Sequence, residues 1–285
     1  MCDMESTMIG CSGYALYNTY PSKFLFDRYM LDTGAQEIFA YAKLIVKDGI
    51  TIGYVLAYLA HPEETRYALR LLPQYAELYG TVISGVEGMF PEKSMYRVIA
   101  NSLEPSLCEA LIEGGYENTG EERWQAGMDL REYTETNVMW TDEVVNFLSG
   151  ADIDDRVEHA EIPTGKPATR AMYEAMMSGP YYKYALDYVV RSAADNKFMG
   201  YITWWIDEKS NTATLEPVAC LPEFRRRGIM KRALFHGLNE LKRRGMNYAY
   251  VSTSIRNEAS RSLYGLAGFR KIGTACRYVK EKQPI

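Results

Sequence analysis

Residues 212–234 read TATLEPVACLPEFRRRGIMKRAL and join two elements of different periodicity. The segment 212–221 predicts a strand that contains Pro217. Proline cannot donate a ladder hydrogen bond, so we expect this strand to bulge near Pro217 and to part from one neighbour. From Met230 onward, apolar residues recur at i, i+3, i+4, i+7, i+8 and i+11, which predicts an amphipathic helix.

The turn between this strand and this helix has the properties of an anion site. Backbone N–H groups at a helix N-terminus lack partners, and the helix dipole favours negative charge there. Gly228 would let the backbone approach a phosphate without an intervening Cβ. A basic helix start without a ligand is the alternative, but cations at this end oppose the dipole, which favours a bound anion. The cations are Arg225, Arg226, Arg227, Lys231 and Arg232.

The neighbouring segments predict the rest of a sheet. LDYVVRS and KFMGYITWWI read as an antiparallel hairpin, and NYAYVSTSI reads as a strand after the helix. Strand, helix and strand with short connections form a βαβ unit with two parallel strands. The expected fold class is α/β (α+β), with a mixed, mostly antiparallel sheet and a central splayed parallel βαβ unit.

These residues resemble the GNAT superfamily of acetyltransferases. Its signature Gln/Arg-x-x-Gly-x-Gly/Ala is matched by residues 225–230, except that Met230 replaces the small residue. A second family pattern begins with Asn257 and continues with a small residue three later, Tyr seven later, and Gly-Phe at eleven and twelve. Two ordered motifs are more specific than either alone. The second motif comprises Asn257, Ser260, Tyr264, Gly268 and Phe269.

The resemblance implies acetyl-CoA as cosubstrate and no metal. It assigns pantetheine binding to the strand backbone, and phosphate binding to the loop and the first turn of the helix. A Met at position 230 is compatible with this role if its side chain points into the core. The implied acetyl-CoA residues are Val218, Ala219, Cys220, Arg225, Arg226, Arg227, Gly228, Ile229, Met230, Lys231, Asn257 and Ser260.

The resemblance also implies direct acetyl transfer to an amine. In this context Tyr264 resembles the tyrosine that protonates the departing CoA thiolate. The family often places a catalytic glutamate on the strand at the position of Thr214, and Glu216 lies two residues on and faces the same way. Glu216 is therefore the candidate base, acting directly or through water, and the alternative is a carboxylate that is only hydrogen-bonded.

The acceptor is expected to be the primary amine of a small molecule. By resemblance it would lie against the early helices and the hairpin, where Tyr181, Tyr182, Tyr184 and Trp204 could form an aromatic wall. A core role for these aromatic residues is the alternative. Nucleic acid is not an expected partner, because the basic residues concentrate on the phosphate loop and its helix.

The first half shows a weaker match to the same order of strands and helices. Ile-Gly53-Tyr54 resembles Met-Gly200-Tyr201, and we expect a degenerate GNAT-like domain over 1–148 and a catalytic one over 149–285. A helical stretch is expected near 63–79. The position equivalent to RRRGIM is assigned to HPEETRYALRLL, which has no glycine and has acidic residues where phosphates would lie. Seven residues after Asn101 stands Cys108 instead of tyrosine. The first half is therefore expected not to bind CoA.

Composition excludes several other classes. The five scattered cysteines and three histidines form no zinc spacing and no nucleophile pattern. No run of eighteen apolar residues exists, so we expect a cytoplasmic protein without a membrane partner, and an oligomer is compatible with the sequence. Residues 1–150 hold ten Lys and Arg against twenty-two Asp and Glu, and residues 151–285 hold twenty-two against fifteen. The basic second half suggests an anionic ligand.

Two function classes remain. The first is an acetyl-CoA-dependent N-acetyltransferase, and the second is a non-catalytic acyl-CoA-binding regulatory module. The presence of both Tyr264 and Glu216 favours the enzyme. One further expectation is a short helical pattern over residues 140–148, before a turn at SGADIDDR.

Overall fold

The computed structural model describes residues 41–58, 63–164 and 167–282. Its first half contains β1 (Tyr41–Lys47), β2 (Ile50–Tyr58), β3 (Glu64–Leu71), the 3-10 helix η2 (Pro73–Leu78), α4 (Tyr79–Met89), β4 (Met95–Asn101), α5 (Pro105–Glu113) and β5 (Glu117–Asp129). Its second half contains β6 (Glu143–Phe147), η3 (Gly150–Asp152), α6 (Ile153–Glu158), α7 (Glu161–Thr164), α8 (Arg170–Met177), η4 (Tyr182–Tyr184), β7 (Leu186–Ser192), β8 (Phe198–Asp207), β9 (Thr212–Cys220), η5 (Pro222–Phe224), α9 (Ile229–Arg243), β10 (Tyr248–Ser254), α10 (Glu258–Leu266) and β11 (Arg270–Glu281).

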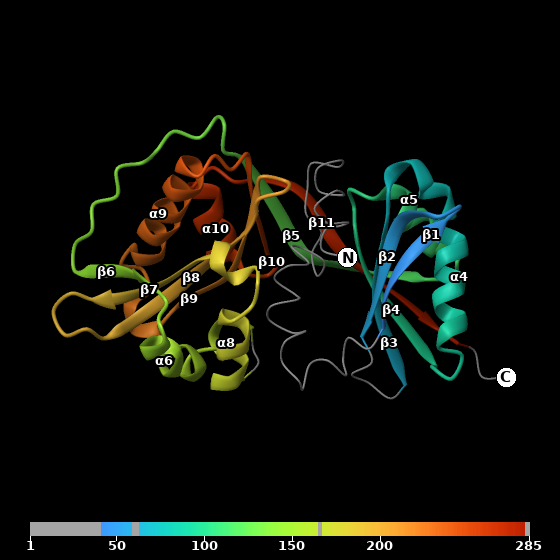
Figure 1. Ribbon diagram of the computed structural model, residues 1–285, viewed down its shortest axis with the longest axis horizontal. Coiled ribbons are helices and arrows are strands. Elements are labelled where there is room, and N and C mark those ends of the chain that lie inside the picture. The colour runs from blue at the N-terminus through green and yellow to red at the C-terminus, as the bar shows by residue number, and fades with distance from the viewer. Residues whose placement is uncertain (1–40, 59–62, 165–166, 283–285) are drawn as a thin grey trace.

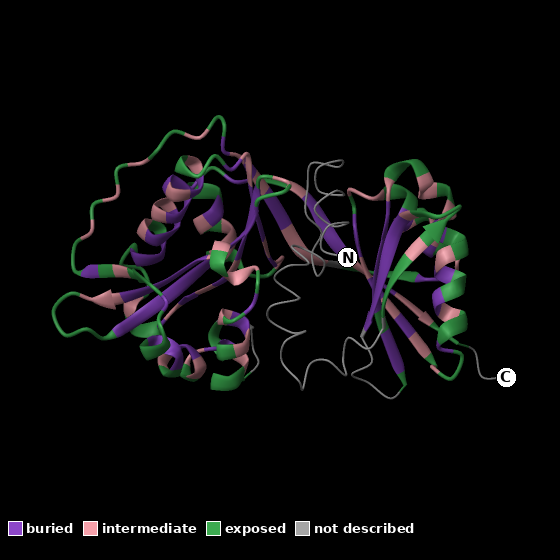
Figure 2. Cartoon of the chain, in the orientation of Figure 1, coloured by how far each residue is buried: buried purple, intermediate pink, exposed green. Residues whose placement is uncertain are grey.

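All the described strands belong to one sheet, in the order β1-β2-β3-β4-β11-β5-β10-β9-β8-β7-β6. The sheet is shared by two lobes, which the long strands β5 and β11 connect (Figure 1). The first lobe packs α4 and α5 on its strands, and the second packs α9 and α10 on one face and α6 and α8 on the other. Buried residues concentrate inside each lobe (Figure 2), so each half has its own hydrophobic core.

The two halves exchange their last strands. β11 comes from the end of the chain, yet it pairs antiparallel with β4 of the first half, where Ala275 faces Asn101. β5 comes from the first half and pairs antiparallel with β10, where Asp129 faces Tyr248. β5 and β11 also pair with each other. We therefore propose two halves that divide in sequence near residues 148 and 149 but complete each other's sheet in space.

The repeat suggested by the sequence is present in the fold. A Cβ on Gly53 would lie 2.3 Å from the carbonyl oxygen of Arg70, and a Cβ on Gly200 would lie 2.3 Å from that of Ala219. In both halves the strand after this glycine leads to a helix and then to a parallel strand. The fold class is therefore confirmed as a mixed, mostly antiparallel α/β structure with two similar halves.

The helices α5 and α10 end in the same way. Gly115 and Gly268 have φ angles of +83° and +100° and follow their helices at the same offset. The next residues, Tyr116 and Phe269, donate their backbone N–H groups back to the helix at 2.9 and 3.1 Å. These turns fix the alignment of the two halves, which places Leu111 of α5 at the position of Tyr264 in α10.

Three local expectations are wrong. Residues 64–71 form β3 and not a helix, because the strand pairs with β2 and β4 on both sides. Residues 143–147 form β6, an edge strand of the sheet, because pairing with β7 outweighs their helical pattern. The segment equivalent to RRRGIM is consequently the one before α4, residues 73–78, and not HPEETR.

The central βαβ unit is splayed as expected. β9 and β10 pair in parallel over residues 212–215 and 248–251 and then separate. The register between β8 and β9 shifts between Ile202 and Trp204, opposite Glu216 and Pro217. The expected bulge near Pro217 is therefore confirmed, and none of the described strands pairs with the carboxyl end of β9 on its β10 side.

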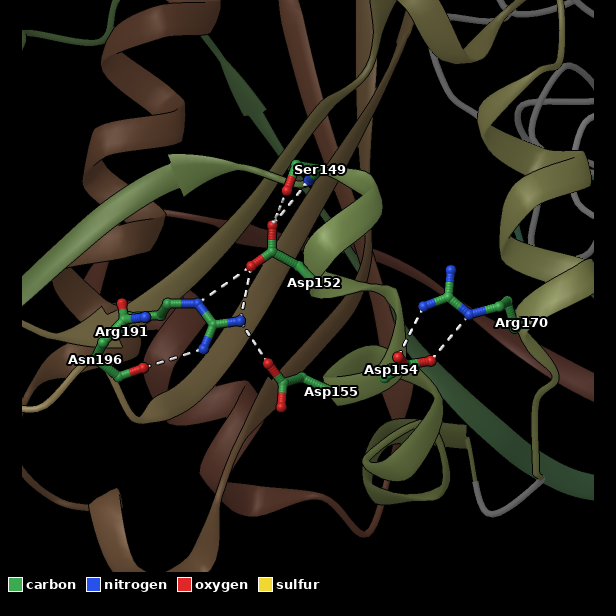
Figure 3. Close-up of polar contacts among 7 residues, drawn as sticks. All are labelled: Ser149, Asp152, Asp154, Asp155, Arg170, Arg191 and Asn196. Carbon is green, nitrogen blue, oxygen red and sulfur yellow. Dashed lines mark hydrogen bonds and ion pairs between the residues drawn. The ribbon is translucent and has the colours of Figure 1, made fainter.

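Ion pairs hold α6 and α8 on the second lobe (Figure 3). Arg191 of β7 donates to Asp152 at 2.7 Å and also contacts Asp155, while Arg170 at the start of α8 pairs with Asp154 of α6 at 2.8 Å. Although burial alone would raise the pKa of Asp152, hydrogen bonds from Ser149 and Arg191 hold it below its ordinary value. These contacts fix the helical layer that covers the Glu216 face of the sheet.

Separating the two halves tests the strand exchange. Without its partner, each fragment would expose unpaired N–H and C=O groups along a long strand of its core. We expect the fragments 1–148 and 149–285 to lack a cooperative thermal transition alone, and to form a 1:1 complex that melts cooperatively when they are co-expressed. Circular dichroism and light scattering measure both. A fragment 1–148 that folds alone as a monomer would contradict the exchange.

Candidate active site

The loop between β9 and α9 has the backbone of an anion site. Arg226 and Gly228 have φ angles of +64° and +75°, so two residues within three adopt the left-handed conformation. A non-glycine residue held at positive φ is typical of functional loops. Helix α9 begins at Ile229, and no side chain caps its first turn. Its first N–H groups are therefore available to a ligand, with the helix dipole behind them.

Most of the predicted cations of the loop lie at its surface. Arg225, Arg226, Arg227 and Lys231 are exposed. Arg225 donates to the carbonyl oxygen of Cys220 at 3.1 Å, which ties the loop to the end of β9. The guanidinium of Arg227 lies 5.4 Å from the centre of the Phe224 ring. The loop thus presents positive charge around the N-terminus of α9.

Arg232 has a structural role that the sequence did not indicate. Its side chain donates to the buried carboxylate of Glu143 on β6 and, at 3.1 Å, to the carbonyl oxygen of Arg227. Burial alone would raise the pKa of Glu143, but hydrogen bonds from Arg232 and Thr141 hold it below its ordinary value. Arg232 therefore joins the edge strand, the phosphate loop and α9.

The splay gives β9 a backbone edge beside this loop. Leu221 donates its N–H to Met199 of β8 at 3.0 Å, so alternation directs the polar groups of Val218 and Cys220 away from β8. Ala219 faces Tyr201 in the ladder to β8. The side chain of Met230 is buried in the core, which leaves only its backbone at the loop.

Tyr264 lies in the core of the second lobe, behind the splay. Its ring is 5% exposed and stacks on Trp124 of β5 with a centroid distance of 6.4 Å. Burial raises the pKa of Tyr264 to about 12, Ser260 and Arg123 lower it, and Glu216 raises it further. The charges of Glu216 and Arg123 thus act on the same hydroxyl, and Tyr264 stays protonated at neutral pH.

Asn257 and Ser260 form the cap of α10. The Asn257 side chain accepts a hydrogen bond from the backbone N–H of Ser260 at 3.0 Å. The Ser260 side chain in turn lowers the pKa of Tyr264, against the larger rise that burial causes. This cap orients the helix turn that carries the tyrosine.

Glu216 lies on the opposite face of the sheet from α9. It shares that face with Thr214, and its carbonyl oxygen accepts a hydrogen bond from the indole of Trp205 at 2.9 Å. The indole also meets the ring of Tyr182 edge-on, with a centroid distance of 5.9 Å. Tyr182 and Trp205 therefore lie on the Glu216 side, and the partly buried Tyr181 precedes η4.

Trp204 does not belong to this face, contrary to the expectation of an acceptor contact. It is 0% exposed and packs beneath α9, where a Cβ on Gly237 would lie 2.1 Å from its indole nitrogen. Side chains alternate along β8, so Trp204 and Trp205 point to opposite faces. Trp204 is a core residue, whereas Trp205 lies on the Glu216 face, where the sequence had predicted Trp204.

A buried ion pair supports Tyr182. Asp187 accepts from Arg156 at 2.6 Å, from Thr203 at 2.7 Å and from the Tyr182 hydroxyl at 3.1 Å. Burial, and next the charge of Asp187, raise the pKa of Tyr182 above its ordinary value. This cluster fixes the Tyr182 ring. Its members are dispersed through residues 156–203, so no local motif pointed to it.

Arg123 and Trp124 also lie near Tyr264, although no sequence motif indicated them. Both come from β5, and Arg123 donates to the hydroxyl and the carbonyl oxygen of Ser252 at 3.1 and 3.0 Å. They lie in the second lobe because β5 pairs with β10, and no spacing of residues in the sequence predicts that pairing.

In the described part of the first half, the loop before α4 and the residue at the Tyr264 position differ from those of the second half. Its loop before α4 is η2, which contains Pro73 and has no basic residue in its last turn. The hydroxyl of Tyr79 hydrogen-bonds to the N–H of Leu71 at 3.2 Å, on the strand position that corresponds to Cys220. Among the residues that the structure describes in this half, Leu111 stands at the position of Tyr264.

Among the described residues, no group of three or more His, Cys, Asp or Glu is arranged to hold a metal ion. None of the described helices has the length and apolar character needed to cross a membrane.

Known proteins are similar to this chain in fold. Residues 167–269 match the Acetyltransferase (GNAT) family. A GCN5-related N-acetyltransferase from Sphaerobacter thermophilus superposes with a TM-score of 0.66 at 17% identity, over 99% of this chain and 92% of that one. A tandem GNAT protein from the clavulanic acid biosynthesis pathway gives 0.61 at 12% identity, over 85% and 82%.

A GNAT-family acetyltransferase from Colwellia psychrerythraea gives a TM-score of 0.63 at 11% identity, over 98% of this chain and 95% of that one. No curated protein matches the chain at a significant level. At these identities the structural likeness concerns the fold, and it extends over both halves.

Gly228→Asp tests the loop. The substitution adds a carboxylate where phosphate would bind, and its Cβ would lie 2.9 Å from Arg232. We expect the rise in melting temperature caused by acetyl-CoA to disappear. Gly245→Asp is the matched control, because Gly245 has φ +74° at the other end of α9 and no atom near its Cβ. Loss of the acetyl-CoA response in both variants, or in neither, would rule out this loop as the phosphate site.

Proposed function

We propose that the GNAT-family acyltransferase domain formed by residues 167–269 transfers the acetyl group of acetyl-CoA to a primary amine of a small molecule. The observation that carries the proposal is the convergence of two features at the splay between β9 and β10. The basic loop, with Arg226 and Gly228 at positive φ, opens onto the N-terminus of α9, and beside it the polar groups of Val218 and Cys220 point away from β8.

Acetyl-CoA would bind along the path from the loop to the splay. The pyrophosphate would accept hydrogen bonds from the backbone of residues 226–231, with Arg225, Arg226, Arg227 and Lys231 neutralising its charge. The pantetheine arm would continue the ladder along Val218 and Cys220, whose polar groups point away from β8. This path leads the thioester to the gap between β9 and β10.

In the transfer step, the amine nitrogen attacks the thioester carbonyl carbon. The C–N bond forms, the C–S bond breaks, and the electron pair leaves on the CoA sulfur. Glu216 accepts the proton that the amine loses, directly or through water, and Tyr264 donates a proton to the thiolate. The products are an N-acetylated amine and CoA, and the two residues are reset by proton exchange with solvent.

The state of Tyr264 suits this role. With its pKa raised to about 12 by burial, the hydroxyl carries its proton throughout the neutral range. Stacking on Trp124 restricts the ring, so the hydroxyl is held in one place. The first half would thus support the catalytic acid through β5, in addition to completing the sheet.

The amine acceptor would approach from the face that carries Glu216, Trp205 and Tyr182. The helices α6 and α8 border this face. We propose a cytoplasmic location, where acetyl-CoA and reduced cysteines coexist; the described residues Cys108, Cys220 and Cys276 are free thiols.

Tyr264→Phe tests the acid. The change removes one hydroxyl and keeps the packing, so folding and acetyl-CoA affinity should hold while turnover falls about 100- to 10,000-fold. Tyr188→Phe, in the same buried core, is the control and should keep turnover. The rates are measured by detecting the CoA thiol released with each of a broad panel of amines. Unchanged turnover in Tyr264→Phe would mean that the thiolate leaves without this residue.

Glu216→Gln tests the base. A deprotonated carboxylate is required for proton removal, so kcat/KM of the wild type should fall toward acidic pH. The amide cannot titrate, and we expect this acidic limb to vanish while acetyl-CoA still raises the melting temperature. An acidic limb that persists in Glu216→Gln would assign the base to another group. Acetyl-CoA binding without turnover of any amine by the wild type would favour the non-catalytic module.

A further inference from the structure

The sheet of the first half ends at the edge strand β1 (Figure 1). None of the described strands pairs with the outer side of β1. The register shift beside Ile45 places its extra residue, Ile52, in β2, so β1 itself alternates regularly. An edge strand of this kind presents a row of backbone N–H and C=O groups that can pair with another strand.

The face of β1 toward α4 carries its charged residues. Ile45 packs against the first-half core, which includes residues of α4. Alternation places Lys43 and Lys47 on this face too, and the Lys47 ammonium lies 5.6 Å from the centre of the Tyr75 ring. Lysines commonly protect an edge strand from unwanted pairing, but here they leave the opposite face of the strand without a charged side chain.

The opposite face of β1 is apolar and exposed. It carries Ala42, Leu44 and Val46, and the exposed fractions of Leu44 and Val46 are 50% and 58%. The residues of β2 that pair with Leu44 and Ala42, which are Tyr54 and Leu56, are buried. The apolar face of the sheet thus continues to its edge, where one further strand would bury it.

The sequence of β1 is complementary to itself. A second copy can pair antiparallel about a twofold axis perpendicular to the sheet, which keeps each side chain on its own face. With the axis at Leu44, all seven residues of β1 pair, Leu44 faces Leu44 of the second copy, and Ala42 faces Val46. Six apolar side chains then form one stripe across the contact.

The two lysines select this register. With the axis at Lys43, this residue would face itself, and with the axis at Ile45, Lys43 would face Lys47. Like charges directly opposite each other destabilise a pair of strands. With the axis at Leu44, Lys43 faces Ile45, and Lys47 faces the first residue of the strand. The exposed lysines then approach each other only diagonally, in solvent.

The other edge of the sheet fits a second copy less well. β6 has only five residues, and its first residue, Glu143, is buried in an ion pair with Arg232. Pairing of β1 with β6 of another copy would leave a free edge on each copy, so the contact would not close into a dimer. Pairing of β1 with β1 uses the same edge of both copies and closes.

We propose that two copies of this chain associate through β1 into a dimer with one sheet that runs across both. Main-chain hydrogen bonds along β1 supply the affinity, and the stripe of Ala42, Leu44 and Val46 fixes the register. Because the contact involves one strand of each copy, its area is small for a specific interface, and we expect a weak, reversible dimer. The dimer does not depend on the function proposed for the second half.

Sedimentation velocity of the full-length protein, over a concentration series into the high micromolar range, tests the dimer. We expect a reversible shift from the 32.5 kDa monomer to a species of twice that mass. A monomer at every concentration, or growth into larger assemblies, would overturn the proposal.

A charge exchange at position 44 tests the partner and the register. Leu44→Lys places two ammonium groups opposite each other, and Leu44→Glu places two carboxylates there, so each variant alone should dimerise at least about tenfold more weakly. An equimolar mixture should recover association as a 1:1 heterodimer, because residue 44 of one copy faces residue 44 of the other. A mixture that fails to associate, or a single variant that dimerises like the wild type, would overturn the proposal.

Val144→Lys on β6 is the matched control, because Val144 is 44% exposed on the opposite edge of the sheet. This variant should dimerise as the wild type does. Melting temperatures of all three variants show that the half-exposed positions tolerate the change. Loss of the dimer in Val144→Lys would place the contact at β6 and would contradict pairing through β1.

The melting-temperature response to acetyl-CoA separates the dimer from the function of the second half. Leu44→Lys should keep that response, and Gly228→Asp should lose it while still forming the dimer. Loss of the dimer in Gly228→Asp would place the contact in the second half and would contradict the proposal.

Discussion

The reciprocal pairing of β5 and β11 is the constraint on which the rest of the structure depends. Each strand ends one half of the chain and completes the sheet of the other, so both halves lose a long edge when either strand is missing. The buried amide of Asn101 bonds Gln125 where β4, β11 and β5 meet, which fixes the register at the junction. We therefore expect the two lobes to unfold as one cooperative structure.

The exchange also brings residues of the first half to the surroundings of Tyr264. β5 supplies Trp124 to the ring of Tyr264 and Arg123 to Ser252, so the proposed acid is held by a strand from the other half. The corresponding place in the first half holds Leu111. The described part of the first half shares the fold, and its helix η2 before α4 has no basic residue in its last turn.

The sequence predicted what depends on local chemistry. Pro217 indicated the bulge, the glycine and cations at 225–228 indicated the loop, and the apolar stripe indicated α9. The predictions were wrong where pairing between distant segments determines the secondary structure. Residues 64–71 and 143–147 form strands because they pair with neighbouring strands of the sheet. Tertiary packing likewise decides which sheet face Trp204 and Trp205 each point to, and it brings Arg123 to the second lobe. The spacing of residues in the sequence does not indicate either.

The central claim is that acetyl-CoA lies between the loop at 225–228 and the splay of β9 and β10. A crystal structure of the full-length protein with acetyl-CoA tests it most directly. The account predicts the pyrophosphate on the N-terminal N–H groups of α9, the pantetheine along β9, and the thioester sulfur within hydrogen-bond distance of the Tyr264 hydroxyl. Acetyl-CoA bound elsewhere, or with its sulfur remote from Tyr264, would contradict it.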